Sequence, residues 1–497
     1  MATINIDILE QIQIIEHYKQ TLAILSWDAK TKGPKNARSQ NAKIQGTLTK
    51  ELYSKQTDKK FARNIERSLE KDLSELERKQ LEFHLKEYKR LSIIPVEDVH
   101  QFSVIKAAAH GNWSEAKKQN NFKLVENDLQ ILIDTKKRFA SLSNRNLSEY
   151  DQLLDEYEPG VLTGTLDNMF DQVKQAIFPL LNSIRNASIQ PDSSFLSAPF
   201  LIDNQIKLGK KLLNSIGYQF ESGEVSETMH PFSTGIHTHD ARLAVRFEEN
   251  NIKLSSLMFL HEGGHSLYNQ QISKRLDTTG LGVYTSMGLH ESQSIFWEKV
   301  IGKHEGFWKN HFHLLREFGP SIYKDISFDQ FYFALNEVKP SFIRYESDDV
   351  TYPLHIIIRY ELEKELFSGN LKVTDLPDAW NEKYDNYLGI RPRTDSEGVL
   401  QDGHWYGGAF GYFPSYLIGF IYAAQIRQVL MREFRNFDDL INDGKLSIFL
   451  EWQKEHIHRF GKLKTSKEIL GDLAIEKINE EPLIQYLTEK YKKLYKL

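Results

Sequence analysis

The sequence predicts a mainly α-helical protein, and three features of its pattern support this fold class. Apolar residues recur every three or four positions over long stretches, the spacing of one helix face. Over residues 5–30 this face consists of Ile6, Leu9, Ile12, Ile15, Tyr18 and Leu22. Residues 64–92 are rich in charge and leucine and contain neither glycine nor proline, which indicates further helix. No repeat period or low-complexity linker divides the 497 residues, so we expect a single large unit over residues 1–497.

One segment departs from the helical pattern. Residues 239–247 (HDARLAVRF) alternate between polar and apolar side chains and include valine and phenylalanine, which predicts a strand of a small β-sheet. This strand precedes the helix that carries the strongest motif. It could pair with an extended peptide through main-chain hydrogen bonds, or it could belong to an ordinary small sheet.

The composition excludes several classes of protein. The net charge is −5 and no long basic stripe is present, so we expect no nucleic-acid partner. The absence of cysteine excludes disulfide frameworks, thiolate metal sites and thiol nucleophiles. The first residues do not have the features of a secretory signal, and no apolar stretch is long enough to cross a bilayer. We therefore expect a soluble, cytoplasmic protein with no membrane partner.

The strongest motif is His261-Glu262-Gly263-Gly264-His265, inside the predicted helix over residues 250–270. Two imidazoles at positions i and i+4 share one helix face and can reach one metal ion. Glu262 follows the first histidine, where a carboxylate can take the proton of a metal-activated water. Two adjacent glycines cost a helix interior roughly 1–2 kcal/mol relative to alanine, so they indicate close backbone approach or space for a ligand.

A catalytic zinc ion needs a third protein ligand, which has to come from another element. Residues 288–299 (GLHESQSIFWEK) predict a second helix that could return to the metal. Its candidate ligands are His290, Glu291 and Glu298. Spacing alone does not choose among the three.

At these residues the chain resembles the carboxypeptidase Taq family of zinc metallocarboxypeptidases. The family pairs the HExxH helix with a downstream His-Glu-Ser-Gln segment, here residues 290–293, whose glutamate is the third zinc ligand. The resemblance therefore selects Glu291. Further segments similar to the family follow one another along the chain: Trp27-Asp28, His230-Pro231-Phe232, residues 343–348 (IRYESD), residues 398–405 (GVLQDGHW) and residues 411–416 (GYFPSY).

The chain departs from the family in one segment. The family's Asp-x-Arg-x-Thr sequence, which is associated with the peptide end, appears here as residues 240–244 with Ala244 in place of threonine. The resemblance therefore does not extend to substrate-length control. Asp240 and Arg242 of this segment remain candidate substrate-binding residues, together with His230 of the His-Pro-Phe element.

The resemblance also implies a fold and a reaction. The fold would be that of a large helical metallopeptidase with a central active-site cleft. Each chain would bind one zinc ion, and two chains would form a homodimer. Cobalt or manganese could substitute for zinc, since site affinity alone does not select the metal. We expect a helical N-terminal lobe over residues 1–150 and a catalytic portion over residues 151–497. The implied reaction releases single amino acids from the C-terminus of peptides, with Glu262 as the general base.

Other residues are candidates for binding the substrate. His404, Tyr412 and Tyr416 can donate hydrogen bonds to a developing oxyanion, and the two tyrosines are not ranked. A free C-terminal carboxylate calls for a guanidinium, and Arg344 is the first candidate and Arg242 the second. Asp402 and Asp348 are candidates to orient the metal-binding histidines.

Two alternative functions are open at this point. The same architecture could cut peptides internally or release dipeptides, as a helical zinc endopeptidase, oligopeptidase or dipeptidyl-releasing peptidase. The chain could also be an inactive peptide-binding scaffold, although an intact Glu262 and a full set of candidate ligands argue against this.

Overall fold

The computed structural model describes residues 4–143 and 146–497 and divides into two compact units. Unit 1 comprises Met1–Ile93, Asp192–Leu335 and Ile426–Lys477. Unit 2 comprises Ile94–Pro191, Asn336–Gln425 and Ile478–Leu497. Each unit is thus assembled from three separate stretches of the chain. The sequence instead led us to expect two consecutive portions, residues 1–150 and residues 151–497, and this division stays a prediction.

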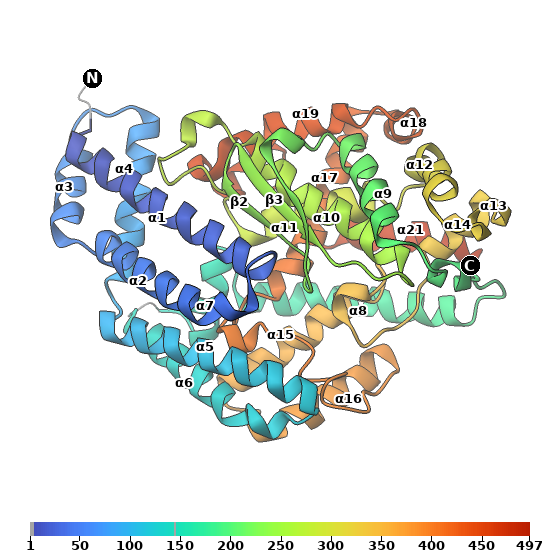
Figure 1. Cartoon of the computed structure of the whole chain (residues 1–497), viewed down its shortest axis with the longest axis horizontal. Helices are drawn as coiled ribbons and strands as arrows, with labels where there is room; N and C mark the ends of the chain where they lie inside the picture. Colours follow the sequence, from blue (N-terminus) through green and yellow to red (C-terminus); the bar gives the residue numbers. More distant parts are fainter. Residues whose placement is uncertain (1–3, 144–145) are drawn as a thin grey trace. The chain divides into compact units, whose positions relative to one another are not determined.

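Unit 1 contains the only sheet of the described residues and a series of helices, most of which are labelled in Figure 1. Its helices are α1 (Ile6–Lys30), α2 (Arg38–Gln56), α3 (Lys59–Leu69), α4 (Glu75–Leu91), α9 (Ile202–Ser215), α10 (Ile252–Gln271), α11 (Met287–Ile295), α12 (Glu305–Phe318), α13 (Ile322–Asp325), α14 (Phe328–Leu335), α18 (Phe437–Asn442), α19 (Ser447–His456) and α20 (Ser466–Asp472). A π-helical segment, Phe296–Ile301, directly continues α11.

The sheet of unit 1 has three strands, β1 (Val225–Glu227), β2 (Phe232–His237) and β3 (Asp240–Val245). β3 is central: it pairs in parallel with β1 and antiparallel with β2, so the strand order is β1-β3-β2. The strand expected over residues 239–247 is therefore confirmed. α10 packs against β2 and β3 and also against α9 and α11, as the middle of Figure 1 shows. This arrangement makes α10 the central helix of unit 1.

The described residues of unit 2 form helices and the loops between them, and include no strand. Its helices are α5 (Val96–Gln119), α6 (Glu126–Leu142), α7 (Glu149–Tyr157), α8 (Thr163–Arg185), α15 (Tyr352–Ser368), α16 (Leu376–Leu388) and α21 (Glu481–Tyr495). α17 (Pro414–Glu433) begins in unit 2 and ends in unit 1. The mainly α fold class with one small sheet is confirmed.

Local sequence accounts for several helix ends. α1 covers Ile6–Lys30, close to the expected residues 5–30, and the Asn5 side chain caps its first turn. The charged stretch over residues 64–92 is not one helix, because Ser74 and Glu77 form a capping box that starts α4 after α3 has ended at Leu69. None of the helices in residues 4–143 and 146–497 is long and apolar enough to cross a membrane.

Candidate metal centre

The two motif histidines lie one turn apart on α10. Asn251 caps the start of this helix by accepting a hydrogen bond from the backbone N–H of Leu254. Nearly every residue from Ile252 to Asn269 is buried, because the sheet, α9 and α11 surround the helix. The ring centroids of His261 and His265 are 5.0 Å apart, and the ring planes are nearly perpendicular. Both imidazoles therefore present nitrogens to the same side of α10.

Helix α11 brings the Glu291 carboxylate to these nitrogens. Its Oε2 lies 3.2 Å from His265 Nε2, and its Oε1 lies 3.7 Å from His261 Nε2. One ligand atom from each of the three side chains lies within 4.8 Å of the others. Burial raises the pKa of Glu291, but the two histidines beside it outweigh burial, so this pKa is lower than usual for a glutamate.

These distances fit a metal ion. Two ligand atoms at about 2.0–2.1 Å from a tetrahedral ion are about 3.4 Å apart, close to both observed separations. Glu291 Oε1 is buried, and no hydrogen-bond donor within the described residues reaches it. A buried carboxylate oxygen without a donor is costly unless a cation meets it. Two neutral imidazoles and one carboxylate are a donor set that suits zinc and related divalent metals.

The glycine pair of the motif allows α10 to approach its neighbours closely. A Cβ atom on Gly264 would lie 2.6 Å from the carbonyl oxygen of Gln293 and 2.7 Å from Cα of Ser294, both backbone atoms of α11. A Cβ atom on Gly263 would instead meet the side-chain ends of Leu213 and Ile216 at 2.7 and 3.0 Å. Gly264 thus sets the separation between the helices that carry His265 and Glu291.

Glu262 lies on the same helix with its side chain buried; the residue is 5% exposed. Burial is the main reason why its pKa is raised above the usual value for a glutamate. Its side chain also has a hydrogen bond with Ser233, a residue of β2. Sequence reasoning missed Ser233, because only the packing of β2 against α10 brings it to this position.

The other two candidates for the third ligand have different surroundings. The His290 ring is stacked between His265 and Tyr284, with centroids 4.2 and 4.1 Å away. Glu298, in the π-helical segment, contacts the other nitrogen of His261, with 2.9 Å between Nδ1 and Oε2. The partner of His261 is therefore Glu298, and the expectation of Asp402 or Asp348 in this role was wrong. No local sequence pattern indicated which of Glu298, Asp402 and Asp348 would contact the histidine.

The remaining candidates in unit 1 lie on or beside the sheet. Arg242 and Asp240 form a bidentate ion pair on β3, with two N–O distances of 2.7 Å. Glu224 lies 4.0 Å from the same guanidinium. His230 lies in the exposed connection between β1 and β2. Ala244, at the position of the family's threonine, is fully buried in β3 and pairs with Phe232 of β2.

In unit 2, the candidates Arg344, His404, Tyr412 and Tyr416 gather in one cluster around Asp402. Arg344 Nη2 lies 3.4 Å from Asp402 Oδ1, and its guanidinium lies 4.5 Å from the Tyr416 ring centroid. The Tyr416 hydroxyl is 3.3 Å from His404 Nε2, and the Tyr412 ring is stacked on His404. Burial is the main cause that lowers the pKa of His404.

A second arginine in this cluster was missed by sequence reasoning. Arg359 is completely buried and lies 2.6 Å from Asp402 Oδ2. It also donates to Gln401 Oε1 and to the His355 carbonyl oxygen. Burial raises the pKa of Asp402, but Arg359 and then Arg344 outweigh burial and hold it well below its usual range. Asp348 accepts hydrogen bonds from Val350 and Thr351 of its own turn.

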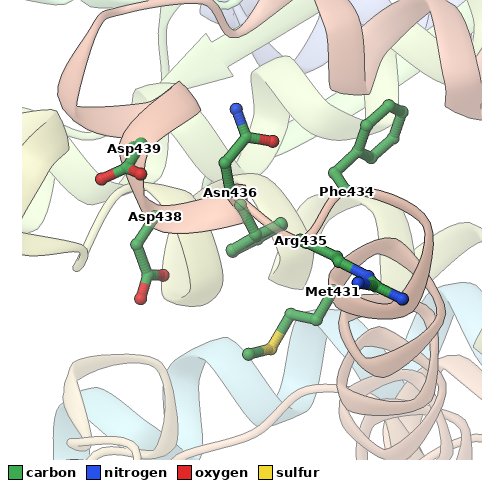
Figure 2. Close-up of a pocket in the computed structure, with 7 residues that line it drawn as sticks. Met431, Phe434, Arg435, Asn436, Asp438 and Asp439 are labelled. Carbon is green, nitrogen blue, oxygen red and sulfur yellow. The ribbon is translucent and has the colours of Figure 1, made fainter.

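A surface cavity of about 210 Å³ in unit 1 lies at the turn between α17 and α18. Figure 2 shows the carboxylates of Asp438 and Asp439 on one side of this turn and the guanidinium of Arg435 on the other. The cavity shares no residue with the metal-binding group. We assign it no part in the site.

Comparison with known proteins gives matches over nearly the whole chain. The family model described as Carboxypeptidase Taq (M32) metallopeptidase matches residues 7–491. Carboxypeptidase 1 of Bacillus subtilis is 40% identical over 493 residues, which are 99% of this chain and 98% of the relative. Thermostable carboxypeptidase 1 of Thermus thermophilus is 33% identical over 95% of each chain. The crystal structure of the M32 carboxypeptidase from Deinococcus radiodurans has a TM-score of 0.95 at 30% identity and covers 99% of both chains.

Proposed function

The chain belongs to the carboxypeptidase Taq (M32) family and is a metallocarboxypeptidase, and from this premise we propose that His261, His265 and Glu291 bind its divalent metal, with Glu262 as the general base. The observation that carries the proposal is the position of the Glu291 carboxylate, 3.2 and 3.7 Å from the two histidine Nε2 atoms. Ion pairs alone would not leave a buried carboxylate oxygen without a donor.

A metal bound by these residues would polarise the scissile carbonyl group and lower the pKa of a water molecule. Glu262 takes the proton of the attacking water and passes it to the leaving amine. Its raised pKa suits this role, because burial makes the protonated carboxyl less unfavourable between the two transfers. The hydrogen bond with Ser233 orients the Glu262 carboxyl group.

We propose Arg344 rather than Arg242 as the group that binds the free carboxylate of the peptide. The carboxylate of Asp240 already takes two N–H groups of Arg242, and a second carboxylate, Glu224, is close by. Arg344 is 3.4 Å from Asp402, whose other oxygen is held by Arg359 at 2.6 Å. Arg359 would continue to neutralise Asp402 if Arg344 bound a substrate carboxylate.

For the developing oxyanion we propose Tyr416 as hydrogen-bond donor, with His404 as its partner. The contact between the Tyr416 hydroxyl and His404 Nε2 supports this choice over Tyr412, whose ring is stacked against His404. Asp402 Oδ1 lies 3.5 Å from the other ring nitrogen of His404, Nδ1. Tyr412, Asp240 and His230 stay predicted members of the site.

Several finer predictions accompany this function. We propose zinc as the ion, with one ion per chain, because two imidazoles and one carboxylate match a three-ligand catalytic zinc site. Cobalt or manganese would be accepted by the same donor set. Peptides with a free C-terminus are the proposed substrates. The homodimer, the central cleft and the cytoplasmic location stay predictions.

Product mapping tests the proposal directly. A defined peptide is digested, and its products are weighed by mass spectrometry over time. Loss of one residue after another from the C-terminus supports the proposal, whereas internal fragments or dipeptides support the alternative peptidases. No turnover after zinc or cobalt is added supports the scaffold.

The same assay tests Arg344 with Arg242 as the matched control. Arg344→Ala should lower kcat/KM for the free peptide by about 100-fold, since a hydrogen bond to a charged group contributes about 1.5–3 kcal/mol. Turnover of the amidated peptide should change little. An unaltered preference for the free over the amidated peptide would contradict the assignment, and loss of that preference in Arg242→Ala would favour Arg242.

A further inference from the structure

The His261 ring is held between two carboxylates of one continuous helical stretch. Glu291 lies 3.7 Å from Nε2, and Glu298 lies 2.9 Å from Nδ1. His265 differs: its Nδ1 is buried and has no hydrogen-bond partner within residues 4–143 and 146–497, and its ring is stacked on His290. The two histidines of the motif are thus supported in different ways, and only His261 has a carboxylate behind it.

A change in helix type accompanies this position of Glu298. In a regular α-helix, residues seven apart return to nearly the same face. Here α11 ends at Ile295 and continues as a π-helix over Phe296–Ile301, which contains Glu298. The hydrogen bond from the Gly302 N–H to the Trp297 carbonyl oxygen, 2.9 Å, spans five residues, as a π-turn requires. Glu298 lies within this π-helical segment, and the two carboxylates contact different nitrogens of one ring.

The Glu298 carboxylate has a partner for each oxygen. Oε2 contacts His261, and Oε1 lies 3.1 Å from the Lys299 ammonium group. Both residues of this ion pair are buried, since Glu298 is 6% exposed and Lys299 is 3% exposed. A buried carboxylate is costly unless it is paired, and Lys299 supplies the pairing charge. Glu298 can therefore accept the Nδ1 proton of His261, which leaves the Nε2 lone pair for a metal.

We infer that Glu298, held by Lys299, is a positioning residue that fixes the tautomer and the ring orientation of His261. This inference rests on the proposed metal site at His261, His265 and Glu291. Glu298 acts through His261 and touches neither metal nor substrate. The π-helical segment is the structural device that gives it this position.

The test is the affinity of the purified full-length protein for zinc, measured by competition with a chelator. Glu298→Gln removes the charge but keeps the shape, and it should weaken zinc binding by about 10–100-fold, the usual effect of losing such a partner. Glu361→Gln is the matched control, because Glu361 is a largely buried glutamate of unit 2 that is paired with Lys174 and Lys383. This control should bind zinc as the wild type does.

A second readout does not depend on affinity. The visible absorption spectrum of the cobalt-substituted protein should shift in Glu298→Gln and stay unchanged in Glu361→Gln, because only the former reorients a ligand. If Glu298→Gln does not fold, Glu298→Asp keeps the charge but is one methylene too short to reach Nδ1, and it should weaken zinc binding in the same direction.

Two results keep the inference and the proposed function apart. Wild-type zinc affinity with an unchanged cobalt spectrum in a folded Glu298 variant would overturn the inference and leave the metal site standing. Wild-type zinc affinity in His261→Ala would overturn the metal site itself, and the inference would fall with it.

Discussion

Gly264 offers a quantitative test of how the two helices of the proposed metal site approach each other. In Gly264→Ala the new Cβ atom would lie 2.6 and 2.7 Å from backbone atoms of Gln293 and Ser294, where ordinary contacts begin at 3.4 Å. Backbone atoms cannot rotate away, so α11 has to move from α10 by about 0.7–0.8 Å. His265 is the next residue along α10, and Glu291 precedes Gln293 by two. The displacement therefore acts directly on the 3.2 Å separation of their ligand atoms.

The expected effects of Gly264→Ala follow from that shift. Overpacking costs about 1–3 kcal/mol of folding stability. The better helix propensity of alanine offsets about 1 kcal/mol of this. The loss of turnover should be larger than the loss of stability suggests, because a misplacement of about 1 Å at a catalytic site can cost about 100-fold.

Gly263→Ala is the control within the same motif. Its Cβ atom would meet only the side-chain ends of Leu213 and Ile216, which can move by small rotations. We expect its stability within about 1 kcal/mol of the wild type and its zinc affinity unchanged. Zinc affinity by chelator competition and kcat on a peptide are the two assays. If Gly264→Ala binds zinc and turns over like the wild type, close approach is not the reason for the glycine.

Three further predictions concern acid, metal removal and the oxyanion. Burial lowers the pKa of His84 to about 4, and its Nε2 lies 2.9 Å from the Thr279 carbonyl oxygen. Between pH 6.5 and 4 the unfolded chain binds a proton that the folded chain does not. Stability present above pH 6.5 should therefore fall by about 3 kcal/mol on acidification, and urea unfolding of His84→Gln should lose this slope. A chelator should lower the melting temperature of the wild type but not that of His261→Ala, since a metal at 100 times its Kd stabilises the folded state by about 2.7 kcal/mol. Tyr416→Phe should lower kcat by about 100-fold, and a larger loss in Tyr412→Phe would move the donor to Tyr412.

Local sequence patterns predicted helices α1 and α10 and the strand β3. Apolar spacing anticipated α1 and α10 to within two residues at each end, and alternation anticipated β3. The break before α4 was missed, although the Ser74–Glu77 capping box can be read in the sequence. Helical periodicity does not register a capping box, because the box changes hydrogen bonding at the backbone and leaves the apolar spacing intact.

The proposed metal-binding group could be predicted only in part from the same patterns. The i, i+4 histidines follow from helix geometry, but the third position depends on where α11 lies after a loop of more than a dozen residues. That loop is held by distant parts of the chain: His84 contacts Thr279, and the Lys462 N–H donates to the Leu281 carbonyl oxygen. Residue spacing along the chain does not predict these contacts. Glu291 was therefore selected as the third ligand from the resemblance to the family.

Supporting residues were the hardest to predict. Glu298 was a candidate metal ligand. Its contact with Nδ1 of His261 comes from a π-helical segment that no sequence pattern predicted. Ser233 and Arg359 act across different elements, and their partners Glu262 and Asp402 lie 29 and 43 residues away in the chain. Such groups become visible only when packing brings the elements together.

The central claim is that His261, His265 and Glu291 hold the metal while Glu262 moves the proton. Its most direct test is Glu262→Gln, with metal content and peptide turnover measured on the same preparation. We predict one bound metal ion per chain, as in the wild type, and a loss of kcat of at least 100-fold, since a positioned base contributes about 10²–10⁴. Turnover near the wild-type rate with the metal in place would contradict the account.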